Sequence, residues 1–261
     1  MDPIEGVLFD LDGVFYIGDE VVKGAANTLA WCRQRQIPFR FITNTSTKTT
    51  GAVASKLQAL GLQVSVADIF SAVNATVDFL TQQGAPSVHL LIRDSVKIEF
   101  EQFEQETSNP DYVVVGDIGA AWDYALLNRV FRELMAGSKL IAMHKNKYFQ
   151  TERGLQMDIG AFVAGLEYIS GKKAIVIGKP SASFFQLATD ALGLRPEQVV
   201  IIGDDIENDV GGAQVNGLRG VLVRTGKYRE ELADASSVQP DGIIDSIAEL
   251  PEWLEARLEW N

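Results

Sequence analysis

The sequence predicts an α/β protein whose core is a Rossmann-like, doubly wound parallel sheet, with a second α/β domain inserted into it. Three observations favour this fold class. Short apolar runs alternate with helical stretches along almost all of the 261 residues. These runs lack the polar alternation of half-exposed strands, which is typical of strands buried on both faces of a parallel sheet. Polar motifs follow four of the runs, and one long interval divides the motifs into two pairs.

The predicted strands are short and end at turn residues. They cover residues 4–9, 39–42, 174–177, 199–202 and 220–223, with further strands at 88–92, 112–115 and 140–144. Helices are expected at residues 25–35, 47–60, 159–169 and 182–192. Gly61 and Gly193 directly follow two of these helices and are typical C-terminal caps. This order of strand, helix and strand indicates parallel strands joined by crossover connections.

Composition limits the partners and the cellular location. The formal net charge of −12 disfavours nucleic acid and anionic membrane as partners. Cys32 is the only cysteine, so an intrachain disulfide is excluded. Without a signal-peptide pattern or an apolar run of transmembrane length, a cytoplasmic location is the default expectation. We expect a small-molecule substrate, and a homodimer is left open as the oligomeric state.

The most informative motif follows the first strand, where Asp10 and Asp12 precede Gly13. On an extended backbone, residues i and i+2 point the same way, so both carboxylates can face one site. One carboxylate can act as a nucleophile while the other transfers a proton, and together they can hold a divalent cation. The alternative interpretation is an Asx turn that merely ends the strand, because Asp-Gly favours such turns.

Three further polar motifs each begin directly after a predicted strand, namely Thr43-Asn44-Thr45-Ser46, Gly178-Lys179-Pro180 and the acidic run at 204–209. Each has a simpler interpretation by itself: a helix N-cap, a surface lysine before a helical proline, and a solvated first turn of a helix. Ligands of open parallel sheets bind beyond the carboxyl ends of the strands. Because all four motifs occur together, we expect them to meet at one site.

Phosphoryl transfer would use all of these side chains, because it depends mostly on positioning and charge neutralisation. Asp10 is predicted to be the nucleophile that forms an aspartyl-phosphate, and Asp12 the acid and base that serves the leaving oxygen and then water. Mg²⁺ is predicted at Asp10, Asp204 and the backbone carbonyl of Asp12. The side chains predicted to hold the substrate phosphate are those of Thr43, Asn44, Thr45 and Lys179.

As a set, the four motifs resemble those of the haloacid dehalogenase-like (HAD) hydrolase superfamily. The resemblance covers essentially the whole chain and rests on DLDGV at 10–14, TNTS at 43–46, GKP at 178–180 and GDDIEND at 203–209. Further stretches, at 155–160, 164–168, 209–214 and 223–227, are similar to the subgroup with a large α/β cap. The resemblance implies Mg²⁺-dependent hydrolysis of a phosphate ester or anhydride. It also implies metal contacts for Asp10, Asp12 and Asp204, and phosphate contacts for Thr43, Asn44 and Lys179. Asp205 and Asp209 stay open as indirect supports of the metal.

Spacing locates the inserted domain. About 135 residues separate Asn44 from Lys179, whereas one βαβ unit needs roughly 30. We therefore predict a catalytic core made of residues 1–79 and 179–261, and a cap domain at 80–178 that covers the site like a lid. The loop at 151–158 is expected to reach the site. Asp158 is either part of that contact or only the N-cap of the next helix.

Two other function classes are weighed against a phosphatase. A carbon–halogen hydrolase on the same fold also uses an aspartate nucleophile but needs no second acid and no metal, so Asp12 and Asp204 count against it. A phosphoprotein-binding or interaction module without turnover is disfavoured, because every catalytic residue type is present. None of these motifs identifies the physiological substrate.

Overall fold

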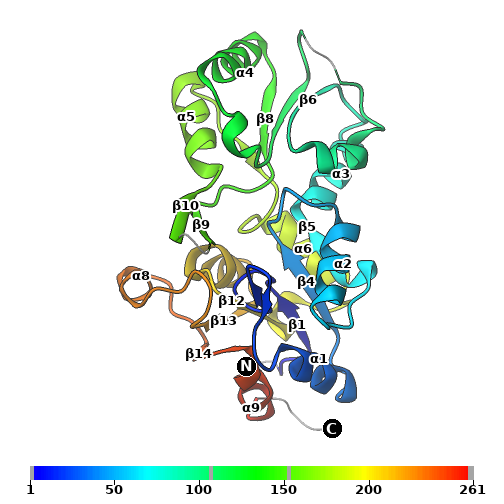
Figure 1. Ribbon diagram of the computed structural model, residues 1–261, viewed down its shortest axis with the longest axis vertical. Helices are drawn as coiled ribbons and strands as arrows, with labels where there is room; N and C mark the ends of the chain where they lie inside the picture. Colours follow the sequence, from blue (N-terminus) through cyan, green and yellow to red (C-terminus); the bar gives the residue numbers. More distant parts are fainter. Residues whose placement is uncertain (1–2, 106–107, 152–153, 258–261) are drawn as a thin grey trace.

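The computed structural model describes residues 3–105, 108–151 and 154–257. Its larger sheet has six parallel strands and confirms the predicted doubly wound core (Figure 1). From edge to edge they are β14 (Gly242–Ile244), β13 (Arg219–Val223), β12 (Val199–Gly203), β1 (Gly6–Phe9), β4 (Phe39–Thr43) and β5 (Ile69–Ser71). The chain winds from β1 through β4 to β5 on one side and later from β12 to β14 on the other. The direction of winding therefore changes beside β1, where open sheets of this kind bind ligands.

Helices cover both faces of the larger sheet, because its strands are apolar on both faces. Phe9 packs on one face with side chains of α1 (Ala25–Gln34), α2 (Thr50–Ala59) and α9 (Leu250–Glu255). Leu8 packs on the other with those of α3 (Ala72–Gln82), α6 (Ala182–Asp190) and α7 (Gly212–Val215). The short helix α8 (Glu230–Ala235) follows β13.

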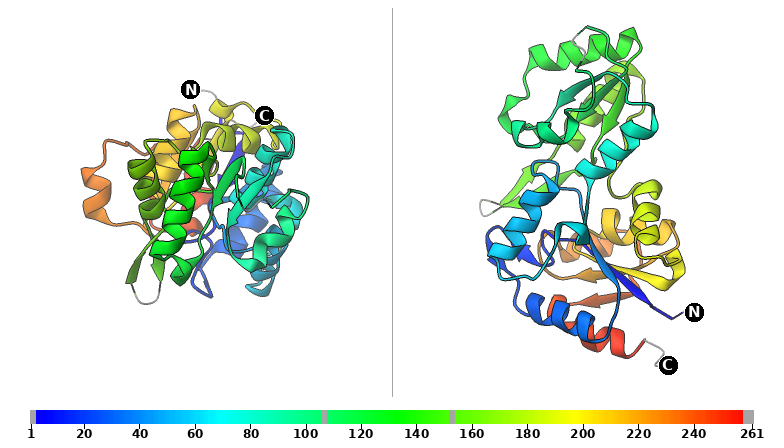
Figure 2. Two further views of the ribbon diagram at one scale, coloured as in Figure 1. Left: turned by 90° about the horizontal axis from the view of Figure 1, so that it is seen from above. Right: turned by 90° about the vertical axis from the view of Figure 1, so that its right-hand side faces the viewer.

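A second parallel sheet of four strands stands beyond the carboxyl ends of the larger one (Figures 1 and 2). Its order is β11 (Ile175–Val176), β8 (Lys139–Ala142), β7 (Tyr112–Val115) and β6 (Val88–Leu91). One face of this smaller sheet packs on α4 (Tyr124–Ala136) and α5 (Gly160–Ser170). The other face joins the apolar cluster that contains α3, so α3 lies between the two sheets and crosses the predicted domain boundary after residue 79.

Two hairpins complete the fold. β2 (Tyr16–Ile17) and β3 (Glu20–Val21) follow the first motif, and β9 (Tyr148–Thr151) pairs with β10 (Gly154–Met157) next to α5. The segment predicted as a loop at 151–158 is thus mostly the second strand of a hairpin, and its residues 152 and 153 lie outside the described part. No helix in the described ranges has both the length and the apolar character needed to cross a membrane.

The strand predicted at 174–177 does not belong to the sheet that carries the other three motifs. Its central residues form β11, which pairs with β8 in the smaller sheet. An apolar run indicates a buried parallel strand, but it carries no information about which sheet the strand joins. Lys179 consequently enters the site as the chain leaves the smaller sheet, where the Gly178 N–H donates to the Met143 carbonyl at 2.8 Å.

The second motif is not a helix cap. The predicted helix at 47–60 begins only at Thr50, and its N-cap is Thr49, whose hydroxyl accepts from the Ala52 N–H at 3.2 Å. The motif that starts at Thr43 therefore forms a separate loop between β4 and this cap, which excludes the simpler interpretation of these residues.

Candidate active site

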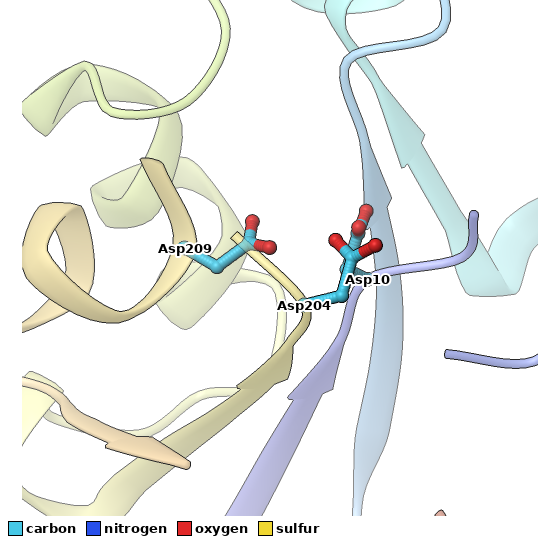
Figure 3. Close-up of side chains that lie close together, drawn as sticks. All are labelled: Asp10, Asp204 and Asp209. Carbon is cyan, nitrogen blue, oxygen red and sulfur yellow. The ribbon is translucent and has the colours of Figure 1, made fainter. Parts of the chain in front are cut away.

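Three buried carboxylates meet at the carboxyl ends of the two central strands. Asp10 directly follows β1, and Asp204 directly follows β12, its hydrogen-bonded neighbour. Asp209 comes from the helical turn Ile206–Gly211 that begins just after Asp204. One oxygen of each carboxylate lies within 4.8 Å of the others (Figure 3). Asp10 and Asp204 are the two carboxylates predicted from the sequence as metal ligands, and Asp209, an open candidate there, lies beside them.

Backbone geometry around Asp204 leaves one carboxylate oxygen without a partner. Its Oδ2 accepts the Lys227 N–H at 2.7 Å, while its Oδ1 is buried and has no hydrogen-bond partner among the described residues. Gly13 and Gly226 both have positive φ and pack so closely on this carboxylate that a Cβ at either position would overlap it. Burial, followed by the charge of Asp10, raises the pKa of Asp204 well above its ordinary value. A cation bound next to Asp204 Oδ1 would compensate this charge, and an uncompensated buried carboxylate is strongly destabilising.

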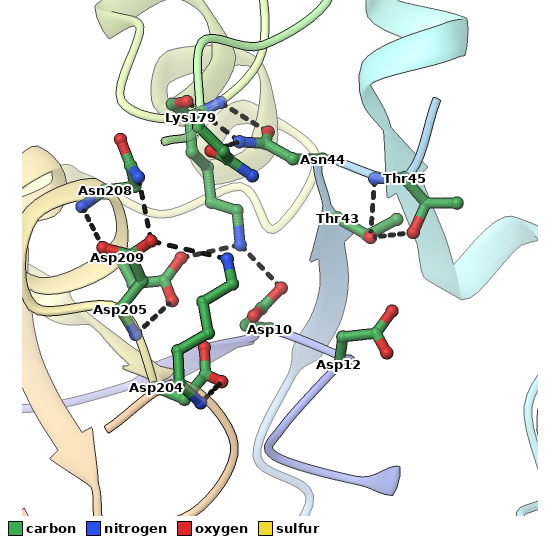
Figure 4. Close-up of polar contacts among 12 residues, drawn as sticks. Asp10, Asp12, Thr43, Asn44, Thr45, Lys179, Asp204, Asp205, Asn208 and Asp209 are labelled. Atoms are coloured by element: carbon green, nitrogen blue, oxygen red, sulfur yellow. Dashed lines mark hydrogen bonds and ion pairs between the residues drawn. The ribbon is translucent and has the colours of Figure 1, made fainter. Parts of the chain in front are cut away.

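Lys179 supplies one positive charge to this cluster. Its Nζ, which is buried, lies 2.6 Å from Asp10 Oδ1 and 2.7 Å from Asp209 Oδ1 (Figure 4). Burial lowers the pKa of Lys179, but the two carboxylates raise it by more, so the amine stays protonated. Asn44 holds the backbone of this lysine from both sides: its Oδ1 accepts the Lys179 N–H at 2.8 Å, and its Nδ2 donates to the Lys179 carbonyl at 3.0 Å.

Asp12 and the loop after β4 line the open side of the site. Asp12 Oδ2 accepts the Tyr16 hydroxyl at 2.9 Å, although the carboxylate stays accessible from the cleft. Desolvation by the surrounding residues raises the pKa of Asp12, and the hydrogen bond from Tyr16 lowers it by less. In the loop, Thr43 Oγ1 accepts the Thr45 N–H at 3.0 Å, and the two threonine hydroxyls lie 2.8 Å apart.

Asp205 stabilises the start of the helical turn that follows it. Its Oδ1 accepts the N–H groups of Glu207 and Asn208, and its Oδ2 accepts the Asn208 side chain at 2.9 Å, so it caps the following turn. Desolvation raises the pKa of Asp205, but Lys227 and these hydrogen bonds lower it by more. Asp209 instead faces inward and accepts the Asp205 N–H at 3.1 Å through Oδ2.

A cleft of about 280 Å³ opens onto these groups. All predicted site residues line it, namely Asp10, Asp12, Thr43, Asn44, Thr45, Lys179 and Asp204. The smaller sheet and its hairpin contribute the opposite wall, made of Asp117, His144, Asn146, Phe149 and Asp158. Asp158 does not cap α5, since the residue at that position is Ile159.

Sequence reasoning did not identify Asn146 or Lys227 as site residues. Lys227 follows β13, in a stretch that was related only to the cap subgroup. Its position after a predicted strand could have indicated that it belongs to the site. Asn146 gives no such signal, because only the folded chain places Asn146 Oδ1 3.2 Å from Asn44 Nδ2.

The chain matches known proteins along nearly its full length. A family model described as haloacid dehalogenase-like hydrolase matches residues 7–106, and one described as HAD-hydrolase-like matches residues 176–250. The human phospholysine phosphohistidine inorganic pyrophosphate phosphatase is 38% identical over 257 residues, which cover 96% of this chain and 94% of the relative. The bovine haloacid dehalogenase-like hydrolase domain-containing protein 2 is 38% identical over 91% of this chain and 90% of its own.

Solved structures share the whole architecture. The 4-nitrophenylphosphatase from Thermotoga maritima superimposes with a TM-score of 0.88 at 26% identity, covering 95% of this chain and 97% of that one. NagD from E. coli gives a TM-score of 0.84 at 27% identity over 95% and 98% of the two chains. This chain therefore belongs to the haloacid dehalogenase-like hydrolase family. The predicted enzyme class, a phosphatase of this family, is confirmed by these similarities.

Proposed function

We propose that this phosphatase is Mg²⁺-dependent and hydrolyses a small phosphate ester or anhydride through a phosphorylated Asp10. The observation that carries the proposal is the buried group of Asp10, Asp204 and Asp209, in which Asp204 Oδ1 has no partner among the described residues. Carboxylate oxygens are the ligands that Mg²⁺ prefers, so the donor set fits this cation. When bound, Mg²⁺ would neutralise phosphate charge. We assign Asp10, Asp204 and the Asp12 carbonyl to hold it, with Asp209 beside them.

In the proposed reaction, Lys179 holds Asp10 Oδ1 and leaves Oδ2 to attack phosphorus. The bond between phosphorus and the leaving oxygen breaks, and Asp12 donates a proton to that oxygen. Asp12 then accepts a proton from water, whose oxygen attacks the phosphorus of the acyl phosphate. This releases inorganic phosphate and restores the Asp10 carboxylate. Lys179, Thr43 and Thr45 are proposed to bind the phosphate oxygens, while Asn44 positions Lys179 through its two backbone contacts.

Replacing Asp12 with asparagine is expected to lower kcat by about 10²–10⁴-fold, the usual contribution of general acid–base catalysis. Mg²⁺ affinity should change little, because the substitution keeps the backbone carbonyl and leaves Asp10 and Asp204 in place. Steady-state kinetics with p-nitrophenyl phosphate and calorimetric titration with Mg²⁺ measure the two effects separately. If Asp12→Asn weakened Mg²⁺ binding as much as Asp204→Ala, the assigned division of tasks would be wrong.

We also propose that residues 80–178 are a separable cap. The support is that β6, β7, β8 and β11 pair only with one another among the described strands. A chain in which a short Gly/Ser linker replaces 80–178 should unfold cooperatively and hydrolyse p-nitrophenyl phosphate slowly. Thermal melting followed by circular dichroism tests this expectation. The same chain with Phe79→Ser controls for aggregation through the exposed end of α3; non-cooperative melting of both would contradict a separable cap.

The substrate is proposed to be a small phosphorylated compound, as the names of the relatives suggest. Turnover of p-nitrophenyl phosphate with Mg²⁺, and no turnover without it, is the expected result that separates this function from its alternatives. A metal-independent dehalogenase would release halide from a haloacid in EDTA, and a binding module would turn over neither compound. A cytoplasmic location and a homodimer stay predictions.

A further inference from the structure

Two buried side chains that line the cleft take no part in the proposed reaction. His144 is 4% exposed and Asp158 is 7% exposed, yet both line the same cleft as Asp10. They lie on the wall formed by the smaller sheet and its hairpin, opposite the catalytic carboxylates. Because the attacking and leaving oxygens of phosphoryl transfer are roughly in line, the leaving group of the proposed reaction points away from Asp10 and toward this wall.

The backbone holds these two side chains in fixed positions. The Asp158 N–H donates to the Lys147 carbonyl, and the Gly160 N–H donates to the Asn146 carbonyl, both at 3.1 Å. A side chain at Gly160 would overlap the Asn146 carbonyl, so only glycine permits this close approach. The segment that carries His144 and the segment that carries Asp158 are thereby tied together, as preorganised binding groups need to be.

Asp158 Oδ2 faces His144 without forming a hydrogen bond to it. Asp158 Oδ1 accepts the Ile159 N–H at 2.7 Å, but Oδ2 lies 3.9 Å from His144 Nδ1, which is too far for a hydrogen bond. Burial lowers the pKa of His144, despite the opposing charge of Asp158, so the ring is neutral. The Asn146 N–H donates to His144 Nδ1 at 3.4 Å, which makes this nitrogen the acceptor and leaves the ring proton on Nε2, next to the Ser46 hydroxyl.

The charge of this wall is negative. Its five described lining residues contain no lysine or arginine. Of their two carboxylates, that of Asp117 lies 3.5 Å from Arg93, so the charge that faces the cleft is mainly that of Asp158. Lys179, which enters as the chain leaves the smaller sheet, is already paired with the carboxylate of Asp10, and Lys227 is paired with that of Asp205. The other lysines that line the cleft, Lys48 and Lys56, come from the side of the larger sheet. An anionic leaving group would therefore be repelled by this wall, whereas a cationic donor would be attracted.

We propose that Asp158, on the wall beside His144, forms a leaving-group subsite that selects phosphate esters whose leaving group carries a protonated amine. An ammonium group placed beside Asp158 donates a hydrogen bond to its Oδ2, so this acceptor gains a partner. The inference rests on the proposed phosphatase mechanism and extends it to a substrate class.

Three substrates that differ in one group test the subsite: phosphoethanolamine, ethyl phosphate and phosphoglycolate, which end in an ammonium, a methyl and a carboxylate. Wild-type enzyme with Mg²⁺ is expected to show a kcat/KM for phosphoethanolamine at least about 10-fold above that for ethyl phosphate, since hydrogen bonds to charged groups have this strength. Phosphoglycolate should be the poorest of the three. Equal values for phosphoethanolamine and ethyl phosphate would overturn the subsite, whatever any variant does.

Asp158→Asn provides a readout that a merely structural residue would not give. Asparagine keeps the oxygen that accepts the Ile159 N–H but removes the charge, so kcat/KM should fall at least about 10-fold for phosphoethanolamine and rise for phosphoglycolate. The value for ethyl phosphate should stay within about threefold. Asp94→Asn, which removes an exposed carboxylate outside the cleft, is the matched control and should change none of the three.

Three outcomes distinguish failure of the subsite from failure of the mechanism on which it depends. An equal loss on all three substrates in Asp158→Asn would overturn the subsite and assign Asp158 to folding. Failure of wild-type enzyme to hydrolyse p-nitrophenyl phosphate with Mg²⁺ would overturn the proposed mechanism and the subsite with it. Hydrolysis of that compound without a preference for the amine would overturn the subsite alone.

Discussion

Replacing Asp10 with asparagine is expected to lower kcat by more than about a thousandfold while the protein stays folded. The amide is nearly the same size as the carboxylate but is a poor nucleophile, so the first chemical step fails. Folding should survive, because β1 is held by its ladders to β12 and β4, and the Asp10 N–H donates to the Ile202 carbonyl at 2.9 Å. None of these backbone contacts involves the substituted atoms.

Release of p-nitrophenol and thermal melting together check this expectation. Asp234→Asn, which changes an exposed aspartate in α8, is the matched control and should retain full activity. A folded Asp10→Asn protein that keeps more than a few per cent of wild-type turnover would exclude Asp10 as the nucleophile. A phosphate found by mass spectrometry on another residue of quenched wild-type enzyme would exclude it as well.

Removing Mg²⁺ is expected to abolish turnover, and Ca²⁺ is not expected to restore it. Asp204 Oδ1 has no other partner among the described residues, and the substrate adds negative charge to a cluster that already holds three carboxylates. Mg²⁺ keeps octahedral geometry at short distances, whereas Ca²⁺ takes more ligands at longer ones. With Ca²⁺ we expect Asp10 to bind through both oxygens, which would leave neither free to attack.

Dialysis against EDTA followed by titration with each cation tests the requirement, with thermal melting as a readout independent of turnover. A cation that binds only the folded state raises the melting temperature. We expect this increase with Mg²⁺ for the wild type and for Asp12→Asn, and its loss in Asp204→Ala. Full activity in EDTA would instead support a metal-free mechanism.

Local sequence patterns were sufficient for the elements that depend on near neighbours. The strands predicted at 112–115 and 199–202 correspond to β7 and β12, and the glycine after the first aspartate pair has the positive φ that its turn requires. These features follow from burial on both faces and from the freedom of glycine, which a short segment expresses by itself. The positions of Asp10 and Asp204 followed too, because parallel strands end at one edge of the sheet.

Only the tertiary structure decided the features that depend on pairing between distant segments. The run at 174–177 looks like any buried strand, but its partner β8 places it in the smaller sheet and makes Lys179 enter from there. Asp158 lies beside His144 only because backbone contacts near Gly160 join two separate segments. The sequence by itself thus determined the catalytic residue types and the core sheet. The contacts that orient these residues and form the opposite wall arise only on folding. Hydrophobic pattern and turn chemistry indicate the environment of a residue, but they do not indicate which distant residue it will contact.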